Sequence, residues 1–206
     1  MHSVLQAARR TIRPIGTTSQ IRDSKVTELN SKNIDCIWNG MTATDELKNQ
    51  INFSSAYMNN SQVAVIRKAD AAKYKDLASM SGAKVVAEAG SAGEIAVKAD
   101  AGLSKSYLPV KDQGTSLMEV KSKTADIAII DAVTAAGSIG EGTDYDDLMI
   151  VDVISSADSE VYAVGIRKSD TELTAKINAA IKELYDDGTL AKLAEKYNLS
   201  GRVIAQ

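Results

Sequence analysis

Short apolar runs, separated by polar turns, set the pattern of this chain. Runs of strand length occur at residues 34–38, 61–67, 83–87, 126–130, 148–154 and 161–168, with a shorter one at 106–108. Between them, helices are predicted at residues 22–30, 45–51, 95–101 and 115–122, whereas 52–55 and 137–147 are polar and predicted to be turns. Because strands and helices alternate, the pattern predicts an α/β fold.

The C-terminal quarter contains the most regular helical pattern. Its apolar face is formed by Leu173, Ile177, Ala180, Ile181 and Leu184. Ser169 and Glu172 form a predicted capping box at its start, Asp187-Gly188 ends it, and residues 190–197 form a last helix. We interpret the apolar face as core packing.

The turn after the strand at 34–38 has the outline of a small-molecule site. Asn39-Gly40 permits backbone torsions that other residues avoid, and the hydroxyl and acidic residues of 42–46 are suited to start a helix. Unpaired N–H groups at such a helix start favour an anion. The same outline also fits an ordinary strand-to-helix turn.

A weak internal repeat supports the site interpretation. Residues 28–40 (ELNSKNIDCIWNG) align with residues 119–131 (EVKSKTADIAIID), and each copy is predicted to be a helix end, a polar turn and a strand. Gly40 and Asp131 align at the carboxyl end of that strand, where ligands bind in open α/β sheets. The repeat therefore predicts two similar lobes, with Gly40 and Asp131 facing a shared cleft.

A second candidate site follows the strand at 83–87. Ser91 and Glu94 form a capping box between glycines, in the segment EAGSAGE, so the turn is suited to bind an anion. A capped helix without a ligand has the same sequence. Asp131 is likewise open to two interpretations, an anionic group in a cleft or a surface turn residue.

Composition excludes several classes of function. The net charge of the 206 residues is −3 with no basic stripe, so no nucleic-acid partner is expected, and no apolar run is long enough to span a membrane. The only cysteine, Cys36, lies in a predicted strand, and the only histidine is His2. An internal disulfide, a metal site, a histidine-dependent triad and a cofactor are therefore not expected. Residues 1–20 lack the apolar core of a secretory signal and are read as an atypical segment.

Four segments together resemble the family 3 extracellular solute-binding proteins, the amino-acid receptors of ABC importers. The first, NIDCIWNGMTATDELKNQINFSSAYMNNSQVAVIRK, resembles the family's strand, Gly-x-Thr-x-Thr, acidic helix start and Phe-Ser-x-x-Tyr. The others are the Gly90-Ser91 turn, the strand ADIAIID and the end, RKSDTELTAKINAAIKELYDDGTLAKLAEKYN. The resemblance covers residues 23–198 and implies a two-lobed periplasmic-binding-protein-like (type II) fold. Lobe 1 is assigned to residues 21–62 and 160–206, and lobe 2 to 63–159.

The resemblance also implies the roles of the site residues. The Gly40 carbonyl and the Asp131 carboxylate would bind the ammonium group of a ligand. Thr42 and the backbone amides of residues 91–93 would bind the carboxylate of the ligand. The full set expected to bind the ligand is Trp38, Asn39, Gly40, Met41, Thr42, Gly90, Ser91, Ala92, Gly93 and Asp131.

Two departures from the family pattern stand out. Leu47 occupies the position of an arginine that binds the ligand carboxylate in the family, and lysine, as at Lys48, does not reproduce its fork geometry. Residues 1–20 do not resemble the family's first strand and helix, so the first lobe is expected to be incomplete.

The leading hypothesis is a non-enzymatic substrate-binding component of an ABC importer, which binds a polar amino acid between its lobes. It is expected to be monomeric, periplasmic or extracellular and cell-surface associated, with a membrane permease as its partner. Two alternatives remain. One is a truncated copy that binds nothing. The other is a cyclohexadienyl-dehydratase-like enzyme, for which Glu88 and Asp131 are the candidate acids.

Overall fold

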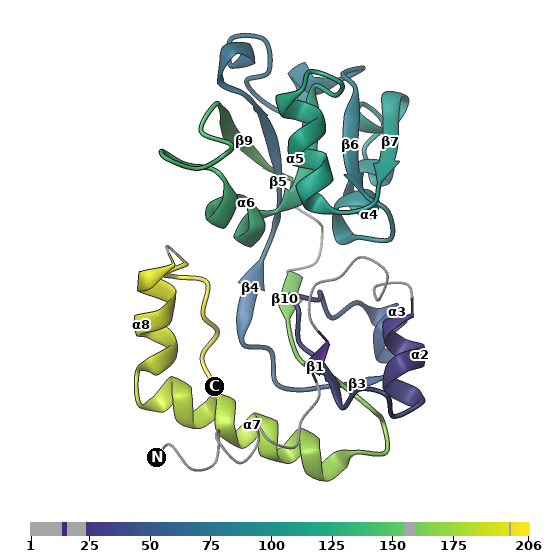
Figure 1. The fold of residues 1–206 in the computed structure, drawn as a ribbon, viewed down its shortest axis with the longest axis vertical. Coiled ribbons are helices and arrows are strands. Elements are labelled where there is room, and N and C mark those ends of the chain that lie inside the picture. Colours follow the sequence, from purple (N-terminus) through teal and green to yellow (C-terminus); the bar gives the residue numbers. More distant parts are fainter. Residues whose placement is uncertain (1–13, 16–23, 155–159, 198) are drawn as a thin grey trace. The chain divides into compact units, whose positions relative to one another are not determined.

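The structure is a computed structural model that describes residues 14–15, 24–154, 160–197 and 199–206 (Figure 1). The chain divides into two compact units. Unit 1 comprises Met1–Asn59 and Glu160–Gln206, and unit 2 comprises Asn60–Ser159. Residues 60–62, predicted from the sequence to belong to the first lobe, lie in unit 2.

Unit 2 contains a five-stranded sheet in the order β7-β6-β8-β5-β9. The strands are β5 (Gln62–Arg67), β6 (Val85–Glu88), β7 (Tyr107–Val110), β8 (Ile127–Asp131) and β9 (Leu148–Ile154). β6 is parallel to β7 and β8, whereas β5 is antiparallel to β8 and β9. The carboxyl ends of β6 and β8 and the start of β5 therefore lie at one edge of the sheet.

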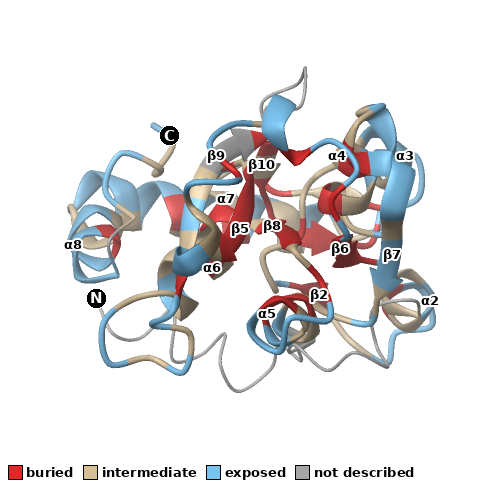
Figure 2. Cartoon of the chain, turned by 90° about the horizontal axis from the view of Figure 1, so that it is seen from above, coloured by how far each residue is buried: buried red, intermediate tan, exposed pale blue. Residues whose placement is uncertain are grey.

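Helices cover both faces of this sheet. Val97 of α4 (Ala92–Ala99) packs with Ala64, Val85 and Ile129 on one face. On the other face, α5 (Gln113–Lys121) and α6 (Ala132–Ser138) pack on strand residues that alternate with these, such as Val63, Val86 and Ile130. Strand residues buried on both faces are apolar, which explains runs such as IAII at residues 127–130. Figure 2 shows β5, β6 and β8 as buried.

Unit 1 contains a four-stranded sheet in the order β1-β2-β11-β3. Its strands have two residues each: β1 (Pro14–Ile15), β2 (Cys36–Ile37), β3 (Asn52–Phe53) and β11 (Gly165–Ile166). Ile37 packs with Leu29 of α2 (Lys25–Asn30), while Cys36 packs with Ile177 and Ile181 of α7 (Thr171–Asp186). The core of unit 1 thus also has a layer on each face of its sheet.

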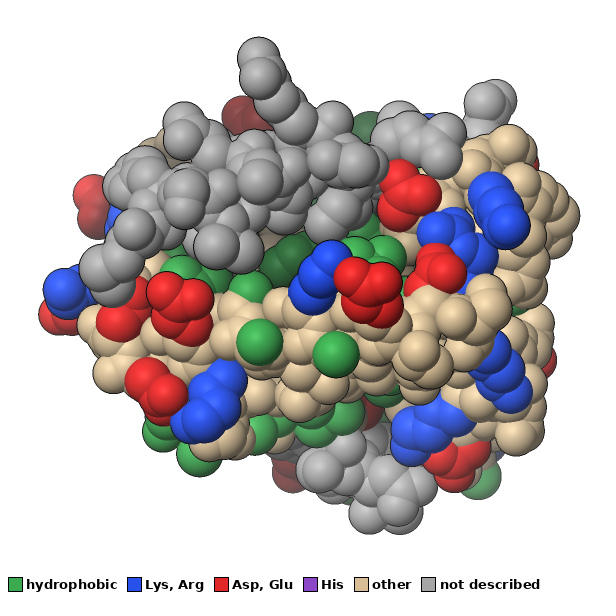
Figure 3. Space-filling view, turned by 90° about the horizontal axis from the view of Figure 1, so that it is seen from below, with side chains coloured by type: hydrophobic (Ala, Val, Ile, Leu, Met, Phe, Trp, Pro, Cys, Tyr) green, Lys and Arg blue, Asp and Glu red, His purple; other side chains and the backbone are tan. Residues whose placement is uncertain are grey.

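The remaining elements are short. α3 (Asp45–Lys48) and α8 (Thr189–Lys196) belong to unit 1, and β4 (Met58–Asn60) pairs with β10 (Glu160–Tyr162) in a two-stranded sheet. Unit 2 also contains the 3-10 turns η2 (Lys68–Asp70), η3 (Ala78–Met80) and η4 (Leu103–Ser106). Acidic and basic side chains lie side by side over the face seen in Figure 3, consistent with the mixed charge of the sequence.

The internal repeat predicted from the sequence exists in the backbone. Lys32 and Lys123 both have positive φ, 64° and 67°, in the turns that join α2 to β2 and α5 to β8. β2-β11-β3 and β8-β5-β9 are both antiparallel series. β1 lies parallel beside β2, as β6 does beside β8. Unit 2 adds α4 and β7, for which the described residues of unit 1 contain no counterpart.

Several local predictions were wrong. Residues 52–53 form β3 rather than a turn, and α6 covers residues 132–138, part of which was expected to be a polar loop. α3 ends at Lys48 instead of residue 51. α7 begins at Thr171 with Asp170 as its N-cap, and Glu172 binds Lys176 rather than a capping partner. The predictions for residues 1–13 and 16–20 lie outside the described residues.

Candidate functional site

Asp131 lies at the end of β8, where its carboxylate accepts hydrogen bonds from three side-chain amides. Oδ1 accepts from Asn60 Nδ2 at 2.8 Å and from Gln62 Nε2 at 2.7 Å, and Oδ2 accepts from Gln113 Nε2. The carbonyl of the Gln113 side chain in turn accepts the Asp131 backbone N–H at 3.1 Å. We call Asn60, Gln62 and Gln113 the amide cradle.

The amide cradle fixes the carboxylate without supplying a positive charge. All three donors are neutral, and among the described residues no lysine or arginine forms an ion pair with Asp131. Asp131 is only half-buried. A positioned carboxylate of this kind is suited to bind a cation through a charge-assisted hydrogen bond.

The start of α4 lies at the same edge of the sheet, after β6. Gly90 has φ +71°, and Ser91 is the N-cap, whose side chain accepts the Glu94 N–H at 3.1 Å. Half of the predicted capping box therefore forms, namely the hydrogen bond to the Ser91 side chain. The Glu94 carboxylate accepts the Gly90 N–H instead of the Ser91 N–H. In the described part of the chain, the N–H groups of Ala92 and Gly93 have no hydrogen-bond partner, so they are available to an anion.

Glu94 does not occupy this anion position. Its carboxylate binds Lys98 Nζ at 2.9 Å, Tyr107 Oη at 2.9 Å and the Gly90 N–H at 2.8 Å. The hydrogen bond from Lys98, followed by that from Gly90, lowers the pKa of Glu94. Burial and the neighbouring Glu94 carboxylate raise the pKa of Tyr107.

Gly93 allows the first turn of α4 to lie directly against the sheet. A Cβ atom there would be 3.0 Å from both Gln62 Oε1 and the Ile129 carbonyl oxygen. The Ile129 oxygen belongs to the backbone of β8 and has little freedom to move. The carbonyl oxygen of Gln62 thus lies beside the first turn of α4, while its NH2 group donates a hydrogen bond to Asp131.

Glu88, the last residue of β6, is 3% exposed. On the strand it follows Val86, which packs under α5 and α6, and the alternation of side chains gives Glu88 the same side. A general acid has to reach the atom that it protonates, and this burial disfavours such a role.

In unit 1, the segment after β2 is shaped by Gly40, which has φ +71°. A Cβ atom on Gly40 would lie 3.5 Å from the ring of Tyr162, the last residue of β10. Thr42 forms an isolated antiparallel bridge with Tyr162, and the Ala43 N–H donates to the Val161 carbonyl at 3.1 Å. The segment is thus held on β10, and Gly40 lies three residues beyond the end of β2 rather than at it.

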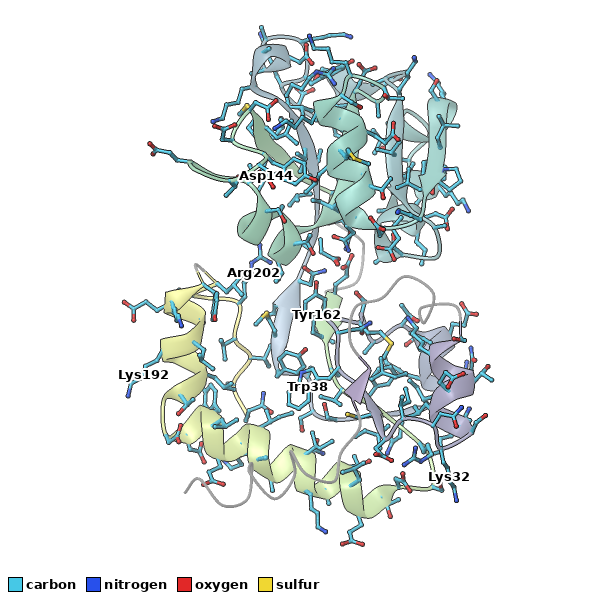
Figure 4. The ribbon with its side chains drawn as sticks, in the orientation of Figure 1. Lys32, Trp38, Asp144, Tyr162, Lys192 and Arg202 are labelled. Atoms are coloured by element: carbon cyan, nitrogen blue, oxygen red, sulfur yellow. The ribbon has the colours of Figure 1, made fainter. Side chains whose placement is uncertain are left out.

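The other residues predicted in unit 1 differ in their surroundings. Trp38 is 46% exposed and lies 6.1 Å from Tyr57, ring centroid to ring centroid, with the planes tilted by 55° (Figure 4 labels Trp38 and Tyr162). Asn39 is half-buried. Met41 is buried, at 6% exposed, and its side chain packs in the cluster with Leu29 and Ile37.

Leu47, where the family resemblance implies an arginine, packs against that same cluster of unit 1. Its side chain contributes to the core, and α3, on which it lies, is only four residues long.

The predicted site residues fall into two sets. Gly90, Ser91, Ala92, Gly93 and Asp131 meet at one edge of the unit 2 sheet, whereas residues 38–42 belong to unit 1. None of the three residues of the amide cradle was predicted from the sequence. The one available signal was Gln62, a polar residue that precedes the apolar residues 63–66 of β5 and pairs in register with Asp131.

Neither a metal cluster nor a membrane span is found in the described ranges. No group of three or more His, Cys, Asp or Glu side chains there is arranged to hold a metal ion. None of the helices in the same ranges is both long and apolar enough to cross a bilayer.

Comparison with known proteins gives one consistent family. Residues 8–200 match the model of the bacterial extracellular solute-binding proteins, family 3. The arginine-binding extracellular protein ArtP of Bacillus subtilis is 34% identical over 179 residues, which cover 85% of this chain and 67% of ArtP. Across the curated relatives, the chain spans 61% to 69% of their length.

Two solved structures illustrate the fold. An amino acid ABC transporter substrate-binding protein from Streptococcus pneumoniae, bound to L-arginine, has a TM-score of 0.75 and 27% identity, over 89% of this chain and 74% of that one. The ancestral amino-acid-binding protein AncCDT-1, a precursor of cyclohexadienyl dehydratase, has a TM-score of 0.74 and 29% identity, over 87% and 75%. These likenesses confirm the predicted α/β fold of the binding-protein type. The chain belongs to the bacterial extracellular solute-binding proteins of family 3.

Proposed function

We propose that this chain is the substrate-binding component of an ABC importer and that its ligand is a cationic amino acid of the arginine type. The observation that carries the proposal is the edge of the unit 2 sheet. There a carboxylate without a cationic partner among the described residues, Asp131, lies at the same edge as the open N–H groups of Ala92 and Gly93. An α-amino acid carries the two complementary groups, an ammonium and a carboxylate, on its α-carbon.

The choice of the arginine class comes from the relatives. ArtP is named for arginine binding, and the Streptococcus pneumoniae structure contains L-arginine. In this chain, we assign the ammonium group to Asp131 and the ligand carboxylate to the start of α4. Thr42 and the Gly40 carbonyl of unit 1 are proposed to contact the same ligand.

Binding without catalysis is the proposed activity. AncCDT-1 is described as a precursor of cyclohexadienyl dehydratase, so an enzyme on this fold is the second candidate. The burial of Glu88 favours the binding protein. Incubation with cyclohexadienyl acids should give no product, and turnover that disappears in Glu88→Gln would favour the enzyme.

The wider setting follows from the family. We propose that the protein acts outside the cytoplasmic membrane, in the periplasm or at the cell surface, as a monomer that delivers its ligand to a membrane permease. Light scattering of the purified chain tests the monomer. Loss of arginine uptake on deletion of the gene tests the role in import.

Calorimetric titration with L-arginine, L-lysine, L-histidine, L-glutamine and L-cystine tests the binding proposal. Arginine is expected to bind most tightly, and Thr42→Ala and Asp131→Asn are both expected to weaken the binding of the same ligand. Trp38, the only tryptophan of the chain, gives a second readout from unit 1. Absence of heat and of a fluorescence change with every ligand would contradict the proposal and favour a copy that binds nothing.

A further inference from the structure

We propose that Gln113 and Gln62 are positioning residues for the ligand: Gln113 orients the Asp131 carboxylate, and Gln62 fixes its distance from the start of α4. This inference rests on the proposed function and deepens it. Through these two residues, the edge of the unit 2 sheet would distinguish a ligand that has an α-ammonium group from a ligand that lacks one.

The hydrogen-bond partners of Asp131 differ from those of two other half-buried acids, Asp126 and Asp35. Asp126 and Asp35 are half-buried acids that receive hydrogen bonds from the guanidinium groups of Arg67 and Arg167. Asp131 is also half-buried, but among the described residues its carboxylate accepts hydrogen bonds from amides only. An arginine partner would offset the negative charge, whereas amides orient the carboxylate and leave its charge available to a ligand.

Gln113 forms two hydrogen bonds with Asp131. Its side chain donates to Asp131 Oδ2 and accepts the Asp131 backbone N–H, so it binds both the side chain and the main chain of one residue. Two such contacts restrict rotation of the carboxylate about its side-chain bonds. Orientation matters because a hydrogen bond to an ammonium group weakens steeply when its angle is lost.

Gln62 is buried, with only 1% of the residue exposed. Its NH2 group binds Asp131, and its carbonyl oxygen lies where a Cβ on Gly93 would come within 3.0 Å. Gly93 carries one of the two open N–H groups of α4. One buried side chain therefore connects the proposed ammonium site to the proposed carboxylate site.

Three ligands separate these roles. Arginine carries both groups, guanidinovalerate is arginine without its α-ammonium group, and agmatine is arginine without its carboxylate. The ratio of the wild-type affinities for arginine and guanidinovalerate measures how much the ammonium site contributes to binding. The preference of the wild type for arginine over agmatine measures the carboxylate site.

Gln113→Leu is expected to reduce the preference for arginine over guanidinovalerate by about tenfold, which corresponds to the free energy of roughly one charged hydrogen bond. The preference for arginine over agmatine should be unchanged. Gln62→Leu is expected to reduce both preferences, with Gln62→Met as a second variant of similar length. Gln50→Leu, at an exposed glutamine of unit 1, is the matched control and should keep both.

A readout from the ligand-free protein accompanies the titration. In Asp131→Asn, the side-chain amide NMR signals of Gln62 and Gln113 should shift and exchange faster with water, because the carboxylate that accepts their hydrogen bonds is gone. Unchanged signals would contradict the amide cradle independently of any ligand.

The outcomes separate the inference from the proposed function. If the wild type prefers arginine and both preferences survive in Gln113→Leu, Gln62→Leu and Gln62→Met, the inference is overturned and the proposed function stands. If the wild type binds none of the three ligands, the proposed function is overturned, and the positioning role with it. The inference is supported if Gln113→Leu loses only the preference over guanidinovalerate, while the Gln62 variants lose both preferences.

Discussion

Arg67 of unit 2 and Arg167 of unit 1 bind equivalent partners. Arg67 Nε donates to Asp70, three residues on, at 2.6 Å, and Arg167 Nε donates to Asp170 at 2.6 Å. In both units, Nη1 donates to two backbone carbonyls and Nη2 to an aspartate, at residues 120, 125 and 126 for Arg67 and 29, 34 and 35 for Arg167. Each arginine thus fastens the helix-turn-strand segment of the internal repeat to the neighbouring strand.

Replacing either arginine should destabilise the protein. The side chains of Arg67 and Arg167 are 12% and 11% exposed, so Arg67→Met or Arg167→Met leaves carbonyls and carboxylates without donors. We expect a loss of about 3 kcal/mol in the free energy of unfolding, measured with a chemical denaturant. Lys192→Met, at an exposed lysine of α8, should change it by less than about 0.5 kcal/mol.

Cys36 should report on unit 1 alone. Burial, and then the charge of Asp35, raises the pKa of the Cys36 thiol to about 11, so the thiol is protonated and unreactive at neutral pH. We expect slow labelling of the native protein by a thiol reagent. Labelling should accelerate in Arg167→Met, because Arg167 binds the Asp35 segment beside Cys36 in the wild type. It should accelerate far less in Arg67→Met. Equal acceleration by both would mean that the two units do not unfold separately.

The Arg67 contacts also predict a pH dependence. Burial alone would raise the pKa of Asp126, but hydrogen bonds from the Lys84 N–H and from Arg67 outweigh it and hold the pKa below its ordinary value of 3.8. A carboxyl group with a lowered pKa in the folded state stabilises the protein above its unfolded-state pKa, and this stabilisation is lost as the pH falls through the folded-state pKa.

The free energy of unfolding should therefore fall as the pH is lowered below 3.8, and it should fall less in Asp126→Asn. Denaturation at a series of pH values measures this. Asp146→Asn, at an exposed aspartate, is the control, and an identical pH dependence of Asp126→Asn and the wild type would contradict the assignment.

Two glycines in helices should respond in opposite directions to alanine. Gly93→Ala places a Cβ 3.0 Å from a backbone oxygen of β8, so we expect a loss of about 1–3 kcal/mol of stability from overpacking. Gly137→Ala in α6 meets nothing within 4 Å and should stabilise the protein by about 0.5–1 kcal/mol through helix propensity. Thermal unfolding measures both, and a neutral Gly93→Ala would show that α4 does not lie so close to the sheet.

The apolar runs made much of the fold predictable from the sequence. Residues 62–67 and 127–131 are buried on both faces, so their composition alone indicates strands. β3 has only two residues, one of them polar, and α6 is a series of small residues without an amphipathic period. Local patterns of this kind are too short to distinguish a strand or helix from a turn.

The candidate site was predictable where its residues follow strand ends. Asp131 and the Gly90–Gly93 turn could be identified because both follow apolar runs and one carries capping residues. The amide cradle could not, since Asn60, Gln62 and Gln113 are 71, 69 and 18 residues from Asp131 in the sequence. Their contact depends on the strand order β6-β8-β5, which the sequence pattern does not specify.

Calorimetric titration of L-arginine into the wild type and into Asp131→Asn tests whether the Asp131 carboxylate binds the ammonium group of the ligand. We expect saturable binding to the wild type and at least about a hundredfold weaker binding to Asp131→Asn, because the substitution removes the charge that binds the ammonium group. Equal affinity of the two proteins for arginine would contradict the account.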